Sequence, residues 1–241
     1  MKSIVKQSPS LLFSIILLVA ILGLGYQVSG AIVKFKTIDR NVVVKGLSER
    51  EYPADKVIWP IQFVEAGNEL TQLHTQLERT SSNITQFLRS KGISDTDVSS
   101  SRPQITDKWA NQYGGGAPVA ELRYTATQTI TVYSEDVDAI RLVMSQISSL
   151  VKQGIVLGGD GYYQQTEYLF SRLNHVKPAM IEEATKNARQ VAEKFAQDSD
   201  SRLGKIRTAS QGQFSVMPRD QNTPHIKRVR VVTTLSYYLV D

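Results

Sequence analysis

Few side chains in this sequence have the types and spacing that catalysis or metal binding requires. The three histidines, His74, His175 and His225, lie far apart along the chain and have no neighbour at the spacing of metal ligands. The chain contains no cysteine, which excludes disulfides, Cys-ligated zinc, iron–sulfur clusters and thiol nucleophiles. His74 falls beside the apolar side of a predicted helix, so we expect a partly buried structural histidine there rather than a ligand.

The motifs of hydrolases, phosphate-binding loops and calcium loops are missing as well. There is no G-x-S-x-G elbow and no Walker loop, and the run Gly114-Gly115-Gly116 lacks the following helix and lysine. The pairs Asp95-x-Asp97 and Asp198-x-Asp200 do not continue with the glycine and glutamate of a calcium loop. We therefore expect no enzymatic activity, no cofactor and no metal ion.

One stretch keeps functional interest because its charge has a single sign. Residues 202–230 contain seven cations and one acid, whereas residues 41–201 carry a compensating acidic excess. The simplest explanation is that these cations face solvent and protect edge strands from pairing with other chains. The functional alternative is an electrostatic surface for anionic lipid headgroups or for the acidic part of a second subunit. The residues predicted for this surface are Arg202, Lys205, Arg207, Lys227, Arg228 and Arg230.

The net charge of +5 does not indicate a nucleic-acid partner, because most of it lies at the N-terminus. Residues 1–40 hold five cations and only Asp39 as an acid, so they carry four of the five net charges. The other 201 residues carry one. Cations that flank an apolar segment serve membrane topology rather than nucleic-acid binding.

The N-terminal segment has the pattern of a membrane anchor. No charged residue lies between Lys6 and Lys34, and residues 11–28 would extend roughly 27 Å as a helix, close to the thickness of a bilayer. We expect a cytoplasmic segment 1–10, an anchor or signal segment 11–30, a linker 31–40 and an exported domain 41–241. Val28-Ser29-Gly30 is also compatible with signal-peptide cleavage, which would leave a soluble periplasmic form.

Residues 41–241 alternate between strand and helix patterns. The first two strands are predicted at 41–46 and 56–64, with Pro60 favouring an edge or a bulge. Further strands are predicted at 98–109, 122–134, 162–170, 205–216 and 229–240. We expect a hairpin tip at 111–118 and a turn at 158–161.

Three helices are predicted between these strands. The first follows a cap at Asn68 and ends at Gly92; the second follows a cap at Ser134 and ends at Gly154. The third extends from near Pro178 to about residue 198. Its predicted packing face consists of Ala184, Ala188, Val191, Ala192, Phe195 and Ala196. The order of elements predicts an α+β fold with a mostly antiparallel sheet region, in one domain or two lobes.

Two segments resemble conserved stretches of the SIMPL-domain family. Val44-Lys45-Gly46 followed by Pro53-Ala54-Asp55 is similar to that family's V-x-G strand end and P-x-D turn. The alanine-rich helix at 184–196, followed by Leu203-Gly204-Lys205-Ile206, resembles the family's alanine-rich helix and L-G-x-I motif. The resemblance covers nearly all of residues 41–241 in the order of elements.

The resemblance implies a bacterial periplasmic or envelope protein of unknown biochemical function. Some members are associated with oxidative-stress defence, and some are antigens that form large homo-oligomers; the family has no established catalytic residues. We expect a non-enzymatic, single-pass protein of the cytoplasmic membrane that self-associates as a scaffold or stress-protective factor. The alternative is a binding module for a small ligand or envelope polymer that uses the hairpin tip, Tyr162, Tyr163, Tyr168 and Phe170.

Overall fold

The computed structural model describes residues 17–27, 40–110, 121–158 and 165–240. The chain forms two compact units. Unit 1 comprises residues 1–49, 178–214 and 230–241, and unit 2 comprises residues 50–177 and 215–229. Each unit contains a β-sheet and helix, and every strand pair with a defined register is antiparallel, which confirms the expected α+β class.

The apolar N-terminal segment is described only at residues 17–27, which form a helix. The remainder of the predicted span, residues 11–16 and residue 28, lies outside the described residues. Within the ranges described above, no helix has both the length and the apolar content needed to cross a membrane.

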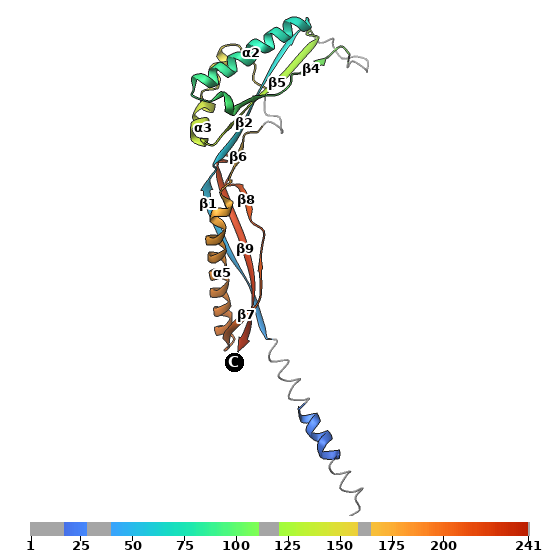
Figure 1. The fold of residues 1–241 in the computed structure, drawn as a ribbon, viewed down its shortest axis with the longest axis vertical. Helices are drawn as coiled ribbons and strands as arrows, with labels where there is room; N and C mark the ends of the chain where they lie inside the picture. The colour runs from blue at the N-terminus through green and yellow to red at the C-terminus, as the bar shows by residue number, and fades with distance from the viewer. Residues whose placement is uncertain (1–16, 28–39, 111–120, 159–164, 241) are drawn as a thin grey trace, which may run out of the picture. The chain divides into compact units, whose positions relative to one another are not determined.

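Unit 2 is built on a five-stranded sheet whose longest strands, β2 and β5, pair along eleven consecutive residues (Figure 1). The strand predicted at 98–109 is interrupted around Pro103, which lacks the N–H that a continuous ladder would use. The tip at 111–118 and most of the 158–161 turn lie outside the described residues. The strands are β2 (Lys56–Gly67), β3 (Val98–Ser100), β4 (Gln104–Asp107), β5 (Tyr124–Ser134) and β6 (Glu167–Leu169).

Helices cover one face of this sheet, and alternation along β2 explains which face it is. Val57, Trp59, Ile61 and Phe63 are buried, whereas the residues between them are only half-buried. The buried side chains pack against α2 (Leu70–Ser90), α3 (Val137–Ser145) and α4 (Ser148–Lys152), which lie on that face (Figure 1). Ile58, Pro60 and Gln62, which alternate with these buried residues, point to the opposite face of the sheet. We call this opposite face the open face.

The ends of these helices confirm two predictions and correct two others. Gly92 and Gly154 adopt φ values of +85° and +83° after α2 and α4, as predicted for left-handed stops. Asn68 does not cap α2, because its Oδ1 accepts a hydrogen bond from the backbone N of Arg123. The cap of α3 is Asp136 rather than Ser134, since Asp136 Oδ1 accepts from Ala139 N at 2.9 Å.

Among the residues that the structure describes, none pairs with Pro60 on the edge of β2, in agreement with the prediction of an edge or a bulge. β6 pairs only with residues 56–58 of β2, and the next contact on that edge is at residues 62–64. Gln62 and Val64 both direct backbone groups to this edge. Alternate residues of a strand direct their backbone groups to the same side, so the backbone N of Pro60 also points to this edge. The missing N–H of Pro60 therefore falls in the gap, where no ladder hydrogen bond is lost.

Unit 1 contains the strand order β1-β9-β7 with α5 packed along β1 and β9 (Figure 1). The buried face of α5 repeats every four residues: Met180, Ala184, Ala188, Ala192 and Ala196. Val191 and Phe195 do not belong to that face, because they are 42% and 56% exposed. The elements are β1 (Asn41–Pro53), α5 (Leu173–Asp198), β7 (Arg202–Gln211) and β9 (Ile226–Val240); β8 (Ser215–Pro218) pairs with β9.

Candidate functional site

The six cations predicted to form an electrostatic surface lie on two strands. Arg202, Lys205 and Arg207 are exposed on β7, and the guanidinium of Arg207 lies 5.9 Å from the ring centroid of Tyr238. Arg228 and Arg230 are exposed on β9.

Lys227 is the exception, because its side chain is only 8% exposed. Alternation along β9 places it on the same side as Val229 and Val231, which are fully or almost fully buried. Burial lowers the pKa of the Lys227 ammonium, and the charge of Glu167 opposes that shift. Lys227 therefore does not face solvent, contrary to the pattern inferred from charge alone.

Acidic side chains of β1 and the β8–β9 loop reduce the charge of this basic stretch. Nε of Arg230 lies 3.8 Å from Glu49 Oε2. Arg219 lies 3.4 Å from Glu51 Oε2 through Nη1 and 3.0 Å from Asp220 Oδ2 through Nε. Exposed pairs of this kind contribute little to stability, but they offset charge locally.

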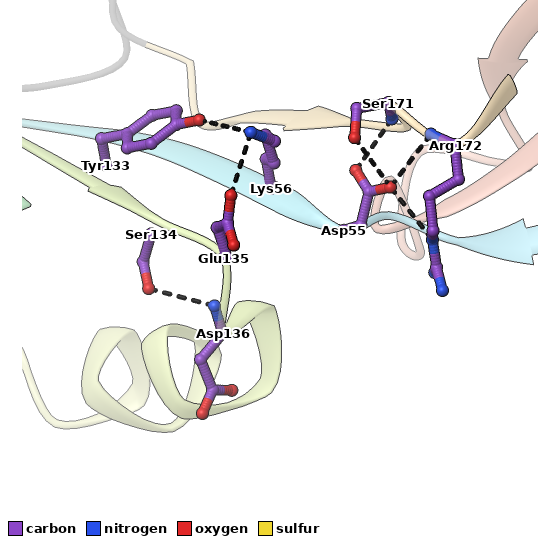
Figure 2. A network of polar contacts seen from close by, with 8 residues as sticks. All are labelled: Asp55, Lys56, Tyr133, Ser134, Glu135, Asp136, Ser171 and Arg172. Atoms are coloured by element: carbon purple, nitrogen blue, oxygen red, sulfur yellow. Dashed lines mark hydrogen bonds and ion pairs between the residues drawn. The ribbon is translucent and has the colours of Figure 1, made fainter. Parts of the chain in front are cut away.

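A polar network around Asp55 joins the start of β2 to the segment before α5 (Figure 2). The Asp55 carboxylate accepts hydrogen bonds from the backbone N of Ser171 at 2.8 Å and of Arg172 at 3.2 Å. The Ser171 hydroxyl and Arg172 Nε also donate to it, each at 3.1 Å. Burial raises the pKa of Asp55, but these four hydrogen bonds outweigh it and hold the pKa below its ordinary value. Asp55 is thus a structural carboxylate.

Lys56 forms a second cluster beside the first (Figure 2). Its Nζ donates to the hydroxyl of Tyr133 at 2.8 Å and lies 3.0 Å from Glu135 Oε1. The hydrogen bonds to Tyr133 and Glu135 raise the pKa of the Lys56 ammonium above its ordinary value. A lysine with a raised pKa stays protonated, so this geometry does not support a nucleophilic or basic role.

Two other carboxylates with shifted pKa values are also held by structural contacts. Asp220 accepts from the backbone N of Asn222 and Thr223, each at 2.8 Å, and closes the β8–β9 turn. The hydroxyl of Thr223 is the main cause that lowers the pKa of Asp220. Hydrogen bonds from Nε and Nη2 of Arg123 are the main cause that lowers the pKa of Asp107.

The histidines do not converge on a site. The His74 side chain is 56% exposed with Nδ1 3.7 Å from Glu78 Oε1, so the prediction of a partly buried histidine is wrong. The ring of His225 lies edge-on to Tyr168 at 6.0 Å, and burial lowers its pKa. Within residues 17–27, 40–110, 121–158 and 165–240, no group of three or more His, Asp or Glu could hold a metal ion.

The most promising site is a cleft of about 950 Å³ in unit 2, at the edge of β2 where Pro60 interrupts the pairing. Gln62 faces it beside Leu157 and Gly158, and the β8–β9 loop supplies Asp220 and Gln221. Apolar side chains make up about half of the lining. The full set is Trp59, Pro60, Ile61, Gln62, Ile147, Leu157, Gly158, Gln165, Thr166, Tyr168, Pro218, Asp220, Gln221 and Pro224.

The chemistry of the cleft is polar but almost uncharged. Three amides, Gln62, Gln165 and Gln221, and the Thr166 hydroxyl can donate and accept hydrogen bonds. Among the described lining residues Asp220 is the only charged one, and its oxygens are already engaged in the turn and with Arg219. The arrangement suits recognition of a polar neutral molecule, and its described lining residues include no nucleophile paired with a base.

The aromatic residues predicted for a binding module are only partly tested by the structure. Tyr168 lines the cleft, whereas Phe170 stacks on Tyr52 with ring centroids 5.2 Å apart. Tyr162, Tyr163 and the hairpin tip lie outside the described residues.

Sequence reasoning missed the amides Gln62, Gln165 and Gln221. The one local signal was Pro60 in the middle of a strand pattern, which marks a break in the ladder beside which a cleft can form.

A protein-family model matches residues 42–234; it is the SIMPL model, described as a protein of unknown function (DUF541). The match spans most of the chain, and the chain therefore belongs to the SIMPL family. None of the curated proteins with which it was compared matches it.

The motifs that carry the family resemblance have structural roles in this chain. Gly46 of V-x-G allows α5 to approach β1, since a Cβ there would lie 2.8 Å from the Cβ of Ala188. Asp55 of P-x-D holds the segment before α5. Gly204 of L-G-x-I sits at a register shift between β7 and β9, where a Cβ would lie 2.9 Å from the Tyr238 carbonyl oxygen.

Proposed function

We propose that this SIMPL protein is anchored in the cytoplasmic membrane by residues 11–28 and displays residues 41–241 on the outer side, without catalytic activity. The observation that carries the proposal is the helix at 17–27, whose large aliphatic side chains are 52% to 65% exposed. Exposed aliphatic side chains on every side of a helix are stable in lipid and costly in water. Lys2 and Lys6 precede the helix and favour a cytoplasmic N-terminus.

The proposal of a non-enzymatic role rests on how the titratable groups are used. The carboxylates with lowered pKa values, Asp55, Asp107 and Asp220, hold turns and segment ends. A carboxylate with a lowered pKa is a poor general acid or base near neutral pH. No nucleic-acid partner is proposed, because most of the net charge lies at the N-terminus and Arg230 of β9 lies beside Glu49 of β1.

Membrane fractionation of the full chain with a C-terminal epitope tests the anchor. We expect the wild type to stay with membranes after alkaline carbonate extraction and the double variant Leu18→Lys/Leu22→Lys to be released. Leu142→Lys is the matched control, because Leu142 is 65% exposed on α3 and lies outside the helix at 17–27. A wild-type chain in the soluble cytoplasmic fraction contradicts the proposal. N-terminal sequencing adds a separate result, since a mature chain that starts at Ala31 supports export but contradicts a retained anchor.

We also propose self-association, in which the protein acts as a scaffold or protects the envelope under stress. β1 is an edge strand, and Val43 and Leu47 on it are 61% and 43% exposed. Static light scattering of the full chain in detergent, at low and high salt, measures the assembly. We expect a discrete oligomer that Arg228→Glu/Arg230→Glu weakens, with Arg189→Glu on α5 as the control. A monomer at both salt concentrations contradicts self-association.

A second candidate function, the binding of a small ligand or envelope polymer, is favoured by the cleft at Pro60. It is compatible with anchoring, because a tethered receptor domain needs an open site and no catalytic group. Calorimetric titration of candidate ligands into the full chain tests this second function.

A further inference from the structure

The open face of unit 2 carries a row of threonines on β5, adjacent to the cleft. Thr125, Thr127, Thr129 and Thr131 alternate along the strand and are all half-buried. We call these four residues the threonine ladder. Alternate residues of an antiparallel strand stand about 6.8 Å apart on one face, so the hydroxyls repeat at a fixed interval. β-branched side chains have few χ1 rotamers, which keeps such a row ordered.

Pairing extends this polar row onto the neighbouring strands. On β2, Gln62 lies opposite Thr129 and Pro60 lies opposite Thr131. Gln62 and Pro60 also line the cleft, so the ladder and the cleft are one continuous surface within unit 2. On the other side of β5, Ser99, Gln104 and Thr106 pair with Thr131, Thr127 and Thr125, respectively.

The β2 side of the threonine ladder carries no charge. The open-face positions of β2 opposite the ladder are Pro60, Gln62, Val64 and Ala66, and none is ionisable. Lys56 lies at one end of the ladder, and Asp107 paired to Arg123 lies at the other. The cleft adds Asp220, which is bound to Arg219. In the described part of the chain, the hydroxyls of Thr127, Thr129 and Thr131 make no hydrogen bond. They remain available to a ligand.

These features favour one class of ligand over its competitors. An added β-strand is excluded along the ladder, because β5 is paired on both sides. A second copy of the sheet would bury facing hydroxyls without adequate partners, whereas packed sheets use apolar inner faces. Among the described residues, the charges beside the ladder and the cleft are already held in ion pairs: Lys56 with Glu135, Arg123 with Asp107, and Asp220 with Arg219. They offer a charged polymer little counter-charge. A neutral chain rich in hydroxyl and amide groups matches the donors and acceptors on the surface.

We infer that the threonine ladder and the adjoining cleft bind a neutral glycan strand. The inference rests on the ligand-binding candidate function and specifies its ligand class. The ladder supplies the hydroxyls of Thr127, Thr129 and Thr131 beneath the strand, whereas the hydroxyl of Thr125 is buried. The amides of Gln62, Gln165 and Gln221 in the cleft hold one end of it.

Calorimetric titration of the full chain tests this inference. The chain is held in a detergent without sugar headgroups, such as lauryldimethylamine oxide, and titrated with chitohexaose, cellohexaose and the acidic polymer hyaluronan. We expect a neutral hexasaccharide to bind and hyaluronan not to bind. The triple variant Thr127→Val/Thr129→Val/Thr131→Val removes three hydroxyls but keeps the side-chain shape, and we expect at least a tenfold weaker Kd. Thr208→Val, at an exposed position on β7 of unit 1, is the matched control.

Two further measurements keep the test decisive. Thermal unfolding shows whether the triple variant is folded, and Gln221→Ala in the exposed β8–β9 loop weakens binding without altering a strand. No binding of a neutral saccharide, or an unchanged Kd in both variants, overturns the inference. If hyaluronan alone binds and Gln221→Ala weakens it, the cleft is a binding site but the neutral class is wrong. Membrane fractionation decides the anchoring proposal separately.

Discussion

Gly46 on β1 and Ala188 on α5 are in such close contact that neither position has room for a larger side chain. A Cβ on Gly46 would lie 2.8 Å from the Cβ of Ala188 and 2.5 Å from its backbone N. Ala188 is fully buried within the four-residue repeat of small side chains on α5. The strand and the helix therefore pack backbone to backbone, which explains both the glycine of V-x-G and the alanine-rich helix.

Gly46→Ala is expected to destabilise unit 1 by about 3 kcal/mol or more, because the new methyl group meets backbone atoms that cannot move aside. The urea midpoint of the full chain measures the effect. Gly67→Ala is the matched control, since a Cβ there would meet only the Cβ of Leu73, at 3.9 Å. Equal midpoints for the two variants would mean that α5 can shift away from β1 at little cost.

Asp55→Asn is expected to lower the free energy of unfolding by about 1 to 3 kcal/mol at neutral pH, because the charge-assisted hydrogen bonds from Ser171 and Arg172 weaken. Asp138→Asn on α3 is the control, since that side chain is 88% exposed. An Asp55→Asn protein as stable as this control would show that the segment before α5 is held by other contacts.

The same carboxylate predicts a dependence of stability on pH. The pKa of Asp55 is lower in the folded protein than its ordinary value of 3.8. Ionised Asp55 therefore stabilises the fold above that value, and its contribution disappears as the pH falls through the folded-state pKa. The difference in unfolding free energy between the wild type and Asp55→Asn should be largest near neutral pH and shrink toward acid. A difference that grows as the pH falls contradicts this assignment.

Thr233→Val is expected to stabilise the protein by about 1 kcal/mol. Thr233 is 4% exposed on β9, and its buried hydroxyl has no hydrogen-bond partner among the described residues. Valine has the same shape and removes the cost of an unpaired buried group. Ser236→Ala on the same strand should instead lower stability, because Ser236 Oγ lies 3.4 Å from Asn41 Oδ1. Thermal unfolding of both variants checks the opposite signs.

Periodicity predicted most of the fold, and tertiary contacts account for the errors. The alternation in β2 and the apolar spacing in α2 are local patterns, and the structure confirms both. α5 begins at Leu173, five residues before the predicted Pro178. The reason is that Asp55 binds the backbone of Ser171 and Arg172. A partner 116 residues away leaves no trace in the local sequence.

The candidate site was harder to predict because it depends on register. Charge counting identified the basic stretch at 202–230 but could not show that Lys227 faces inward. The threonines of β5 formed part of a visible strand pattern. Only the pairing of Thr129 with Gln62 shows that the ladder adjoins a cleft.

Asn187→Ala is expected to expose the free edge of β1. Arg40 O accepts a hydrogen bond from Leu239 N, so alternate residues of β1, including Leu47, direct their backbone groups away from β9. Asn187 Nδ2 on α5 donates to Leu47 O at 2.8 Å and covers that edge. Removal of the amide should cost about 1 kcal/mol and favour strand pairing between molecules. Light scattering over a range of concentrations should therefore give a larger mass for Asn187→Ala than for the wild type. Asn174→Ala is the control, because that exposed side chain accepts a hydrogen bond from Lys177 on the same helix. The same mass and urea midpoint for both variants would show that Asn187 does not protect the edge.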